Sequence, residues 1–144
     1  MEFGKPGEYL TDRLTDEALK VIDNAGEKPF FLYLSHHAPH TPIEAKAEDV
    51  EYFESKLHPD LRHKNAVHAA MMKSFDQSVG RILAKLKERG LDQNTIVVFA
   101  SDNGGYIGID QKAGQTVPVT NNAPLRSGKG SCYEGGVRVP MFVR

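Results

Sequence analysis

The sequence has one cysteine and no tryptophan among its 144 residues. A lone cysteine, Cys132, cannot close a disulfide within the chain. It also lacks the neighbouring cysteines that the common structural zinc sites require. These absences exclude a disulfide-stapled domain and a cysteine-based zinc module.

Neither sign of charge is in excess. Lys and Arg number 18 and Asp and Glu number 19, which gives a formal net charge of −1. The two signs are interleaved along the chain, so no basic stripe is formed. Nucleic acid is therefore not expected as a partner.

Long apolar runs are also missing. No run approaches the ~20 residues that a membrane-spanning helix needs. Residues 1–7 lack the apolar stretch of a signal peptide. We therefore expect no membrane partner, and the composition of 40% hydrophobic and 26% charged residues is that of an ordinary globular domain.

Hydrophobic periodicity predicts three helices, over 11–25, around 47–57 and over 66–89. Gly26 is expected to end the first, and Gly90 is placed to form the left-handed cap of the last.

Three apolar or β-branched runs predict strands, over 29–34, 95–100 and 137–143. The first two are continuous rather than alternating, which is typical of strands buried on both faces in a parallel sheet. Strands alternating with helices predict an α/β domain with a parallel or mixed sheet. The last strand runs directly to the final residue, so we expect this chain to be a fragment.

In such a sheet, chemistry gathers at the carboxyl ends of the strands. Ser101-Asp102-Asn103-Gly104-Gly105 follows one predicted strand. The side chains of Asp102 and Asn103 offer the hard oxygen ligands that Ca²⁺ and Mg²⁺ prefer. The simpler interpretation is an Asp-Asn-Gly turn whose side chains cap backbone groups.

A histidine loop, Ser35-His36-His37-Ala38-Pro39-His40-Thr41-Pro42, follows another predicted strand. Its histidines could bind metal, move protons or hold an anion, and the prolines restrict where His40 points. A solvated surface loop is the alternative.

A third candidate is Leu125-Arg126-Ser127-Gly128-Lys129-Gly130-Ser131. Glycines on both sides of Lys129 would let an anion approach the ammonium group and the backbone N–H groups. The run does not fit the phosphate-binding loop pattern, and a flexible basic turn is the alternative.

Together, these groups suit a metal-assisted displacement at an anionic oxo-ester. Cations would neutralise the oxygens of the transferred group while an acid protonates the leaving alcohol. The residue types alone do not distinguish sulfate from phosphate.

Several motifs occur in a fixed order along nearly the whole chain: Tyr9–Asp12, Pro29–Leu32, Pro39–Pro42, Asp76–Arg81, Thr95–Phe99, Ser101–Gly104, Leu125–Gly130 and Tyr133–Pro140. This ordered set resembles the formylglycine-dependent sulfatases, the arylsulfatase-like branch of the alkaline phosphatase superfamily. The resemblance implies a partial alkaline-phosphatase-like sandwich, with a parallel or mixed sheet flanked by helices. Residues 1–144 would form the middle to C-terminal portion of the large catalytic domain.

The resemblance also implies roles for individual residues. Asp102 and Asn103 would be Ca²⁺ ligands. His40 would bind the sulfate and serve as general acid towards the leaving oxygen. Lys129 would contact a sulfate oxygen and the leaving group, and the substrate would be a small-molecule or carbohydrate sulfate ester.

Three further residues are assigned by the resemblance with less direct roles. His37 would lie near the pocket, and Glu134 and Arg138 would support the last strand. The family nucleophile, a formylglycine made from a Cys/Ser-x-Pro-x-Arg run, has no counterpart here, because Cys132 is followed by Tyr133-Glu134-Gly135. We therefore expect the isolated chain to be inactive and to bind calcium weakly.

Other interpretations stay open. A phosphodiesterase or phosphonate hydrolase of the same superfamily would differ in the nucleophile. A non-catalytic binding module would have no need of all four candidate residues. The isolated chain could also self-associate through exposed apolar surface. The family usually works in the periplasm, the lysosome or outside the cell, but the sequence carries no address.

Overall fold

The computed structural model describes residues 7–144, which divide into two compact units. The first unit contains the chain up to His40 together with Met71–Thr95. The second contains Thr41–Ala70 and Ile96–Arg144. Among the described residues, no helix combines the length and apolar character needed to cross a membrane.

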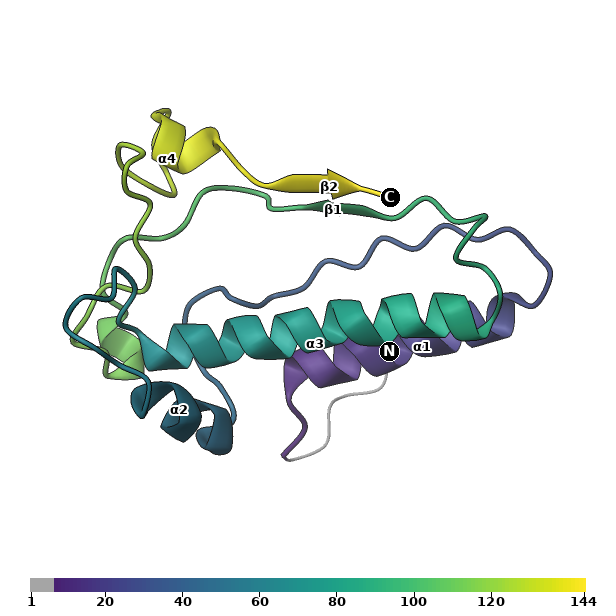
Figure 1. Ribbon diagram of the computed structural model, residues 1–144, viewed down its shortest axis with the longest axis horizontal. Coiled ribbons are helices and arrows are strands. Elements are labelled where there is room, and N and C mark those ends of the chain that lie inside the picture. The colour runs from purple at the N-terminus through teal and green to yellow at the C-terminus, as the bar shows by residue number, and fades with distance from the viewer. Residues whose placement is uncertain (1–6) are drawn as a thin grey trace. The chain divides into compact units, whose positions relative to one another are not determined.

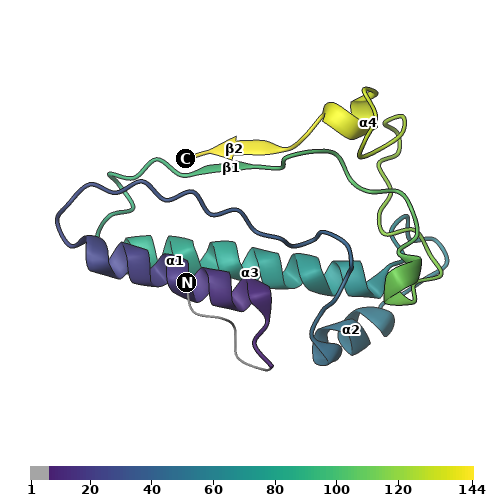
Figure 2. The ribbon, with the colours of Figure 1, turned by 180° about the vertical axis from the view of Figure 1, so that it is seen from behind.

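In the first unit, α1 (Leu10–Ala25) lies beside the part of the long helix α3 (Ala66–Glu88) that begins at Met71. The two helices run in the same direction (Figures 1 and 2). Ion pairs follow this parallel register, because Asp16 pairs with Arg81 and Asp23 pairs with Lys85 at 3.5 Å. Such exposed pairs contribute little to stability. The packing depends instead on buried side chains shared by the helices and the segment after α1: Ala18, Ile22, Ala38, Met71 and Leu86.

A buried chain of hydrogen bonds crosses this interface. His36 Nε2 lies 3.0 Å from Ser78 Oγ, which lies 2.6 Å from Thr15 Oγ1, and Thr15 Oγ1 lies 2.6 Å from the carbonyl oxygen of Thr11. Because a hydroxyl group has one hydrogen, Thr15 donates to the carbonyl, Ser78 donates to Thr15, and His36 Nε2–H donates to Ser78. The other ring nitrogen, Nδ1, is then an unprotonated acceptor, buried with no partner among the described residues. The ring of His36 also packs edge-on against Phe75 at 5.1 Å between centroids.

Acid is expected to destabilise the first unit through His36. Burial holds the pKa of His36 below its ordinary value of about 6.5, so the unfolded chain takes up this proton at a higher pH than the folded chain. The stability contributed by the neutral ring is therefore complete above about pH 6.5 and is lost as the pH falls through the folded pKa. Urea unfolding between pH 8 and pH 5 measures this loss.

The matched variants for this test are His36→Gln and His37→Gln, which change neighbouring residues of different burial. Burial also lowers the pKa of His68, so the wild-type slope contains both groups. His36→Gln should flatten the acid slope, whereas His37→Gln should leave it unchanged. An equal slope in wild type and His36→Gln would contradict the assignment.

The second unit contains the remaining elements, which are α2 (Ala47–Glu54), β1 (Val98–Ala100), the 3₁₀ helix η1 (Gln111–Ala113), α4 (Glu134–Val137) and β2 (Met141–Val143). The two strands pair antiparallel, with Phe99 opposite Phe142. Their rings lie 5.6 Å apart between centroids. Reciprocal hydrogen bonds of 3.0 Å between Val97 and Arg144 extend the ladder by one pair.

The α/β class and the three longer helices are confirmed. Gly26 and Gly90 follow α1 and α3 with positive φ angles of 59° and 67°, which a residue with a side chain rarely adopts. The side of α3 that faces the core carries Ala70, Met71, Ser74, Ser78 and Leu86, all of them buried.

The strand predictions need correction. Segment 29–34 belongs to no strand among the described residues, where only β1 and β2 pair. Its exposure alternates, and Phe31 and Tyr33 are 91% and 80% exposed, so burial on both faces is wrong. Burial on both faces is wrong for β1 as well, since Val98 is exposed. A continuous apolar run predicts a buried strand only where neighbouring layers cover both faces.

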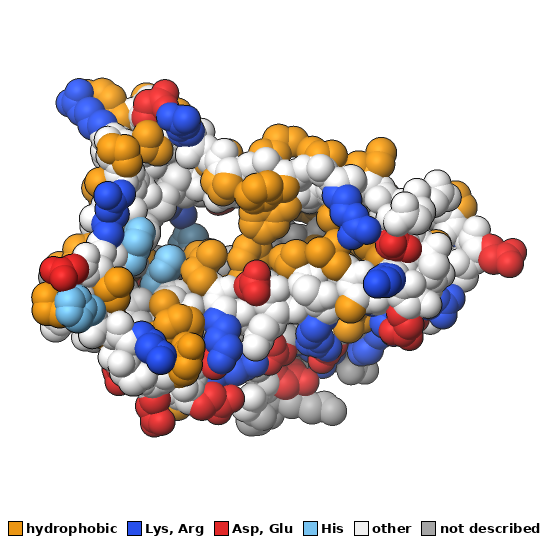
Figure 3. Space-filling model, viewed as in Figure 1, with side chains coloured by type: hydrophobic (Ala, Val, Ile, Leu, Met, Phe, Trp, Pro, Cys, Tyr) orange, Lys and Arg blue, Asp and Glu red, His pale blue; other side chains and the backbone are white. Residues whose placement is uncertain are grey.

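The third predicted strand begins later than expected. Val137 is the last residue of α4, and β2 starts only at Met141. Hydrophobic side chains are visible over the paired strands on the molecular surface (Figure 3). Their exposure leaves an apolar face on this small sheet.

Candidate functional site

Two of the candidate loops are joined through their backbones in the second unit. The N–H of Lys129 donates to the carbonyl of Gly105 at 3.0 Å, and the N–H of Gly104 donates to the carbonyl of Gly136 at 2.9 Å. The N–H of Gly135 donates to the carbonyl of Arg126 at 2.9 Å. Loop 101–105 and loop 125–136 therefore form one backbone cluster, which we call the glycine junction.

Glycine is required at this junction because the backbones approach too closely for a side chain. A Cβ on Gly104 would lie 1.8 Å from the carbonyl oxygen of Gly135. A Cβ on Gly128 would lie 2.4 Å from that of Gly105, and a Cβ on Gly135 would lie 2.1 Å from that of Ser127. Close approach of the backbones is the physical reason for these glycines. From the sequence, we expected a turn at 101–105 and room for an anion beside Lys129.

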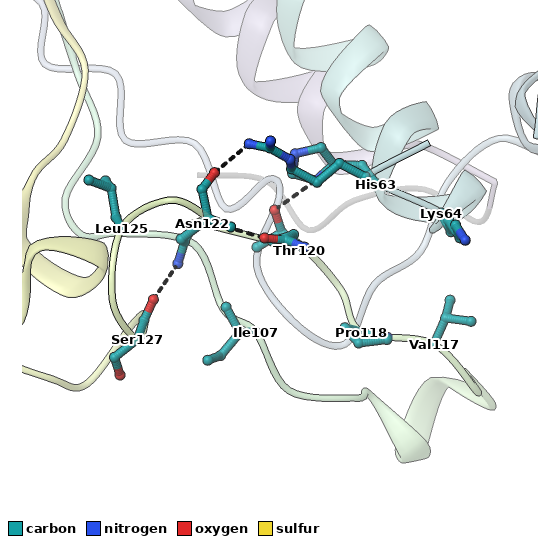
Figure 4. Close-up of a pocket in the computed structure, with 12 residues that line it drawn as sticks. His63, Lys64, Ile107, Val117, Pro118, Thr120, Asn122, Leu125 and Ser127 are labelled. Atoms are coloured by element: carbon teal, nitrogen blue, oxygen red, sulfur yellow. Dashed lines mark hydrogen bonds between the residues drawn. The ribbon is translucent and has the colours of Figure 1, made fainter. Parts of the chain in front are cut away.

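Asn122 holds the junction together, although it was not predicted from the sequence. Its Nδ2 lies 2.8 Å from the carbonyl oxygen of Gly105 and 3.2 Å from those of Ser127 and Gly135. Figure 4 shows the contact with Ser127. One half-buried amide thus satisfies carbonyls from both loops. Its only signal in the sequence was an asparagine in a loop rich in glycine and proline, a pattern that also describes ordinary turns.

Asp102 and Asn103 follow β1 directly, as predicted. Asp102 is exposed, Asn103 is half-buried, and Ser101 Oγ donates to the carbonyl of Asn103 at 2.9 Å. A carboxylate and an amide oxygen on one turn fit the donor chemistry of a calcium ligand pair. Among residues 7–144, no group of three or more His, Cys, Asp or Glu side chains could hold a metal ion. The loop therefore offers part of a coordination shell of six to eight oxygens.

Lys129 places its ammonium group in solvent beside the junction. Its backbone is held by Gly105, and the following Gly130 adopts a φ of 87°, which frees the loop to turn. Within the described part of the chain, the ammonium group forms no ion pair. An exposed, unpaired ammonium on a backbone held by Gly105 can receive an anion.

Neighbouring charged residues in loop 125–138 have structural contacts. Arg126 stacks over the ring of Tyr133, with 3.7 Å between the guanidinium carbon and the ring centroid. Glu134 and Arg138 pair at 3.5 Å across α4. The last two residues thus brace α4, which leads into β2.

The three histidines of the histidine loop, His36, His37 and His40, belong to the first unit. The rings of His37 and His40 lie 5.3 Å apart between centroids, and the N–H of His40 donates to the carbonyl of His37 at 2.9 Å. Both side chains are exposed, unlike the half-buried His36. The structure thus brings Asp102, Asn103 and Lys129 onto one junction, while the role of His40 beside them rests on the family resemblance.

The chain is similar to known proteins along nearly its whole length. The family model described as Sulfatase matches residues 2–144. A sulfatase of Formosa agariphila is 38% identical over 146 residues, covering 94% of this chain and 25% of that protein. The steryl-sulfatase of Mus musculus is 36% identical over 142 residues, covering 97% and 21% respectively.

Among solved structures, Ps i-CgsB in complex with k-i-k-neocarrahexaose is similar with a TM-score of 0.79 and 42% sequence identity. The similarity covers 99% of this chain and 29% of that one. The chain thus spans about a quarter of the length of the relatives it matches. Because the family model matches almost every residue, this chain belongs to the sulfatase family.

Proposed function

We propose that the protein containing this chain hydrolyses a sulfate ester with the help of calcium, and that these residues carry part of its metal site and sulfate site. The observation that carries the proposal is the glycine junction. It fixes the backbone of Lys129 to Gly105 at 3.0 Å, two residues after Asn103. A cation and a pair of hard oxygen ligands are thereby held on one rigid backbone cluster. Residues 1–144 would form the middle to C-terminal portion of the large catalytic domain.

Four residues of this chain would have separate roles in the reaction. Asp102 and Asn103 would hold Ca²⁺, which when bound supplies positive charge for the sulfate oxygens. Lys129 would bind a sulfate oxygen and stabilise the charge that develops on the leaving oxygen. His40 would donate a proton to that oxygen as the alcohol leaves. The nucleophile would come from residues other than these 144, which contain no Cys/Ser-x-Pro-x-Arg run.

A carbohydrate sulfate ester is the substrate class that we favour. The chain is 42% identical to Ps i-CgsB, whose structure was solved with k-i-k-neocarrahexaose bound. It is also 36% identical to two N-acetylgalactosamine-6-sulfatases, from mouse and rat. The bound oligosaccharide of the solved structure and the names of the two N-acetylgalactosamine-6-sulfatases thus both suggest a carbohydrate substrate.

Activity assays on two lengths of the protein test the proposal. The full-length protein should release 4-nitrophenol from 4-nitrophenyl sulfate and lose this activity when a chelator removes calcium. The 144-residue chain alone should be inactive, because it lacks the nucleophile motif. Hydrolysis of 4-nitrophenyl phosphate but not of the sulfate by the full-length protein would reject the proposal in favour of a phosphoester hydrolase.

A further inference from the structure

A pocket of about 390 Å³ lies in the second unit, and Lys129 is not among the residues that line it (Figure 4). One side is formed by segment 62–64, which precedes α3. The other is formed by Ile107 and residues from the loop 117–127. The proposed catalytic roles use none of the charged residues that line it.

The lining is positively charged. It includes Arg62, His63 and Lys64, all exposed, and no aspartate or glutamate. Within the described residues, neither Arg62 nor Lys64 forms an ion pair, so both charges are available to a ligand. The 23-residue helix α3 begins two residues later, and its amino-terminal end adds a partial positive charge. The pocket therefore favours an anion.

Hydrogen bonds hold this basic segment in place. Arg62 Nη1 donates to the carbonyl oxygen of Ala123 at 2.6 Å. His63 Nδ1 lies 3.4 Å from Thr120 Oγ1 (Figure 4). Asn65, directly after the segment, caps α3 by accepting the N–H of His68 at 2.9 Å. Arginine has five N–H donors, so Arg62 keeps further donors for a ligand after binding Ala123.

The rest of the lining suits a sugar. Ile107, Val117 and Leu125 offer apolar surface, against which the C–H faces of a sugar ring can pack. Thr120 and Asn121 contribute groups that can hydrogen-bond to hydroxyls. The positive charges of segment 62–64 can bind an anionic substituent of a sugar, while the apolar side chains contact its ring.

The pocket shares Asn122 and Ser127 with the glycine junction. Asn122 Nδ2 binds the carbonyl of Gly105, which accepts from Lys129 N–H. A chain of linked sugars could therefore occupy the pocket with one residue while another presents its ester beside Lys129.

We propose that this pocket is a subsite for an anionic substituent, sulfate or carboxylate, on a sugar of an oligosaccharide substrate other than the sugar whose ester is cleaved. The inference rests on the proposed function and narrows its substrate class to polyanionic carbohydrate chains. Arg62 and Lys64 supply the recognising charges.

Direct binding tests the subsite without depending on turnover. The full-length protein is titrated calorimetrically with sulfated hexasaccharides from heparin, chondroitin sulfate and carrageenan, with maltohexaose as the uncharged control. At least one sulfated chain should bind more tightly than maltohexaose. The double variant Arg62→Gln/Lys64→Gln should raise its Kd about tenfold at low salt, because two exposed charge contacts are lost. The same variant should weaken the salt dependence of binding.

The matched control is Lys56→Gln/Lys112→Gln, which removes two exposed positive charges elsewhere in the same unit. It should leave the Kd within a factor of two. The inference is overturned if wild type binds no sulfated chain better than maltohexaose, or if both double variants bind alike. A protein that binds sulfated chains at the pocket but cleaves no sulfate ester would instead contradict the proposed function alone.

Discussion

Replacing Gly104 with alanine should destabilise the second unit by at least ~3 kcal/mol, the upper part of the range for overpacked sites. The added Cβ would lie 1.8 Å from the carbonyl oxygen of Gly135 and 2.7 Å from its carbonyl carbon. Both atoms belong to the backbone, so no rotamer change can relieve the clash. Relief requires the two loops to separate, which would break the 2.9 Å hydrogen bond from Gly104 N–H to Gly136.

Two measurements test the expected loss of stability in Gly104→Ala. Urea unfolding gives the change in stability, and hydrogen exchange at the amide of Lys129 reports directly on the junction, because that N–H binds Gly105. Exchange at Lys129 should accelerate in Gly104→Ala. The control is Gly80→Ala in the middle of α3, where an added Cβ meets nothing within 4 Å. Alanine there should stabilise the helix by roughly 0.5–1 kcal/mol. A Gly104→Ala protein within 1 kcal/mol of wild type would show that the loops are not packed as described.

Gly80 and Gly104 differ in whether a distant part of the chain lies against them, and this kind of contact cannot be predicted from the sequence. Helices were predictable because the residues that a helix buries recur at a regular spacing within the helix itself. Ala70, Ser74 and Ser78 recur every four residues and are all buried, and Gly90 ends the helix with the positive φ expected of it. In the sequence alone, nothing distinguishes the packing around Gly80 from that around Gly104. Only the three-dimensional approach of Gly135 makes one of them indispensable.

Strands were less predictable because a strand needs a partner from elsewhere in the chain. Segment 29–34 has a strand-like composition, yet no pairing among the described residues completes it. The predicted strand 95–100 contains β1 (Val98–Ala100), but its partner β2 runs antiparallel. Most residues of the two strands are exposed. Composition indicates that a residue favours extended structure, whereas pairing direction and coverage depend on distant segments.

In the candidate site too, residue types could be read from the sequence, whereas contacts between distant segments could not. Asp102, Asn103 and Lys129 were proposed as site residues from residue type and from the ordered motifs. The structure adds that their loops share one junction. Asn122 was missed because its importance lies in three carbonyls that belong to distant parts of the sequence. The pocket at Arg62 and Lys64 was missed because interleaved charge concealed a local cluster.

Removing the ammonium group of Lys129 should produce the largest loss of activity among the residues of the glycine junction. In the full-length protein, Lys129→Ala should lower kcat/KM for 4-nitrophenyl sulfate by roughly 10²–10³-fold, the usual cost of removing one donor aimed at developing negative charge. The ammonium is exposed and has no ion-pair partner in residues 7–144, so nothing in the fold depends on it. Its substitution should therefore leave stability within ~0.5 kcal/mol of wild type.

A chemical role and a structural role of Lys129 predict different combinations of results. A chemical role requires lost activity with unchanged urea unfolding and unchanged hydrogen exchange at residue 129, because alanine keeps the N–H that binds Gly105. A structural role would change all three together. Lys112→Ala, which removes an exposed positive charge from η1, controls for the general effect of charge and should change kcat/KM less than twofold. Activity of Lys129→Ala within threefold of wild type would remove Lys129 from the proposed site and leave the junction as a purely structural feature.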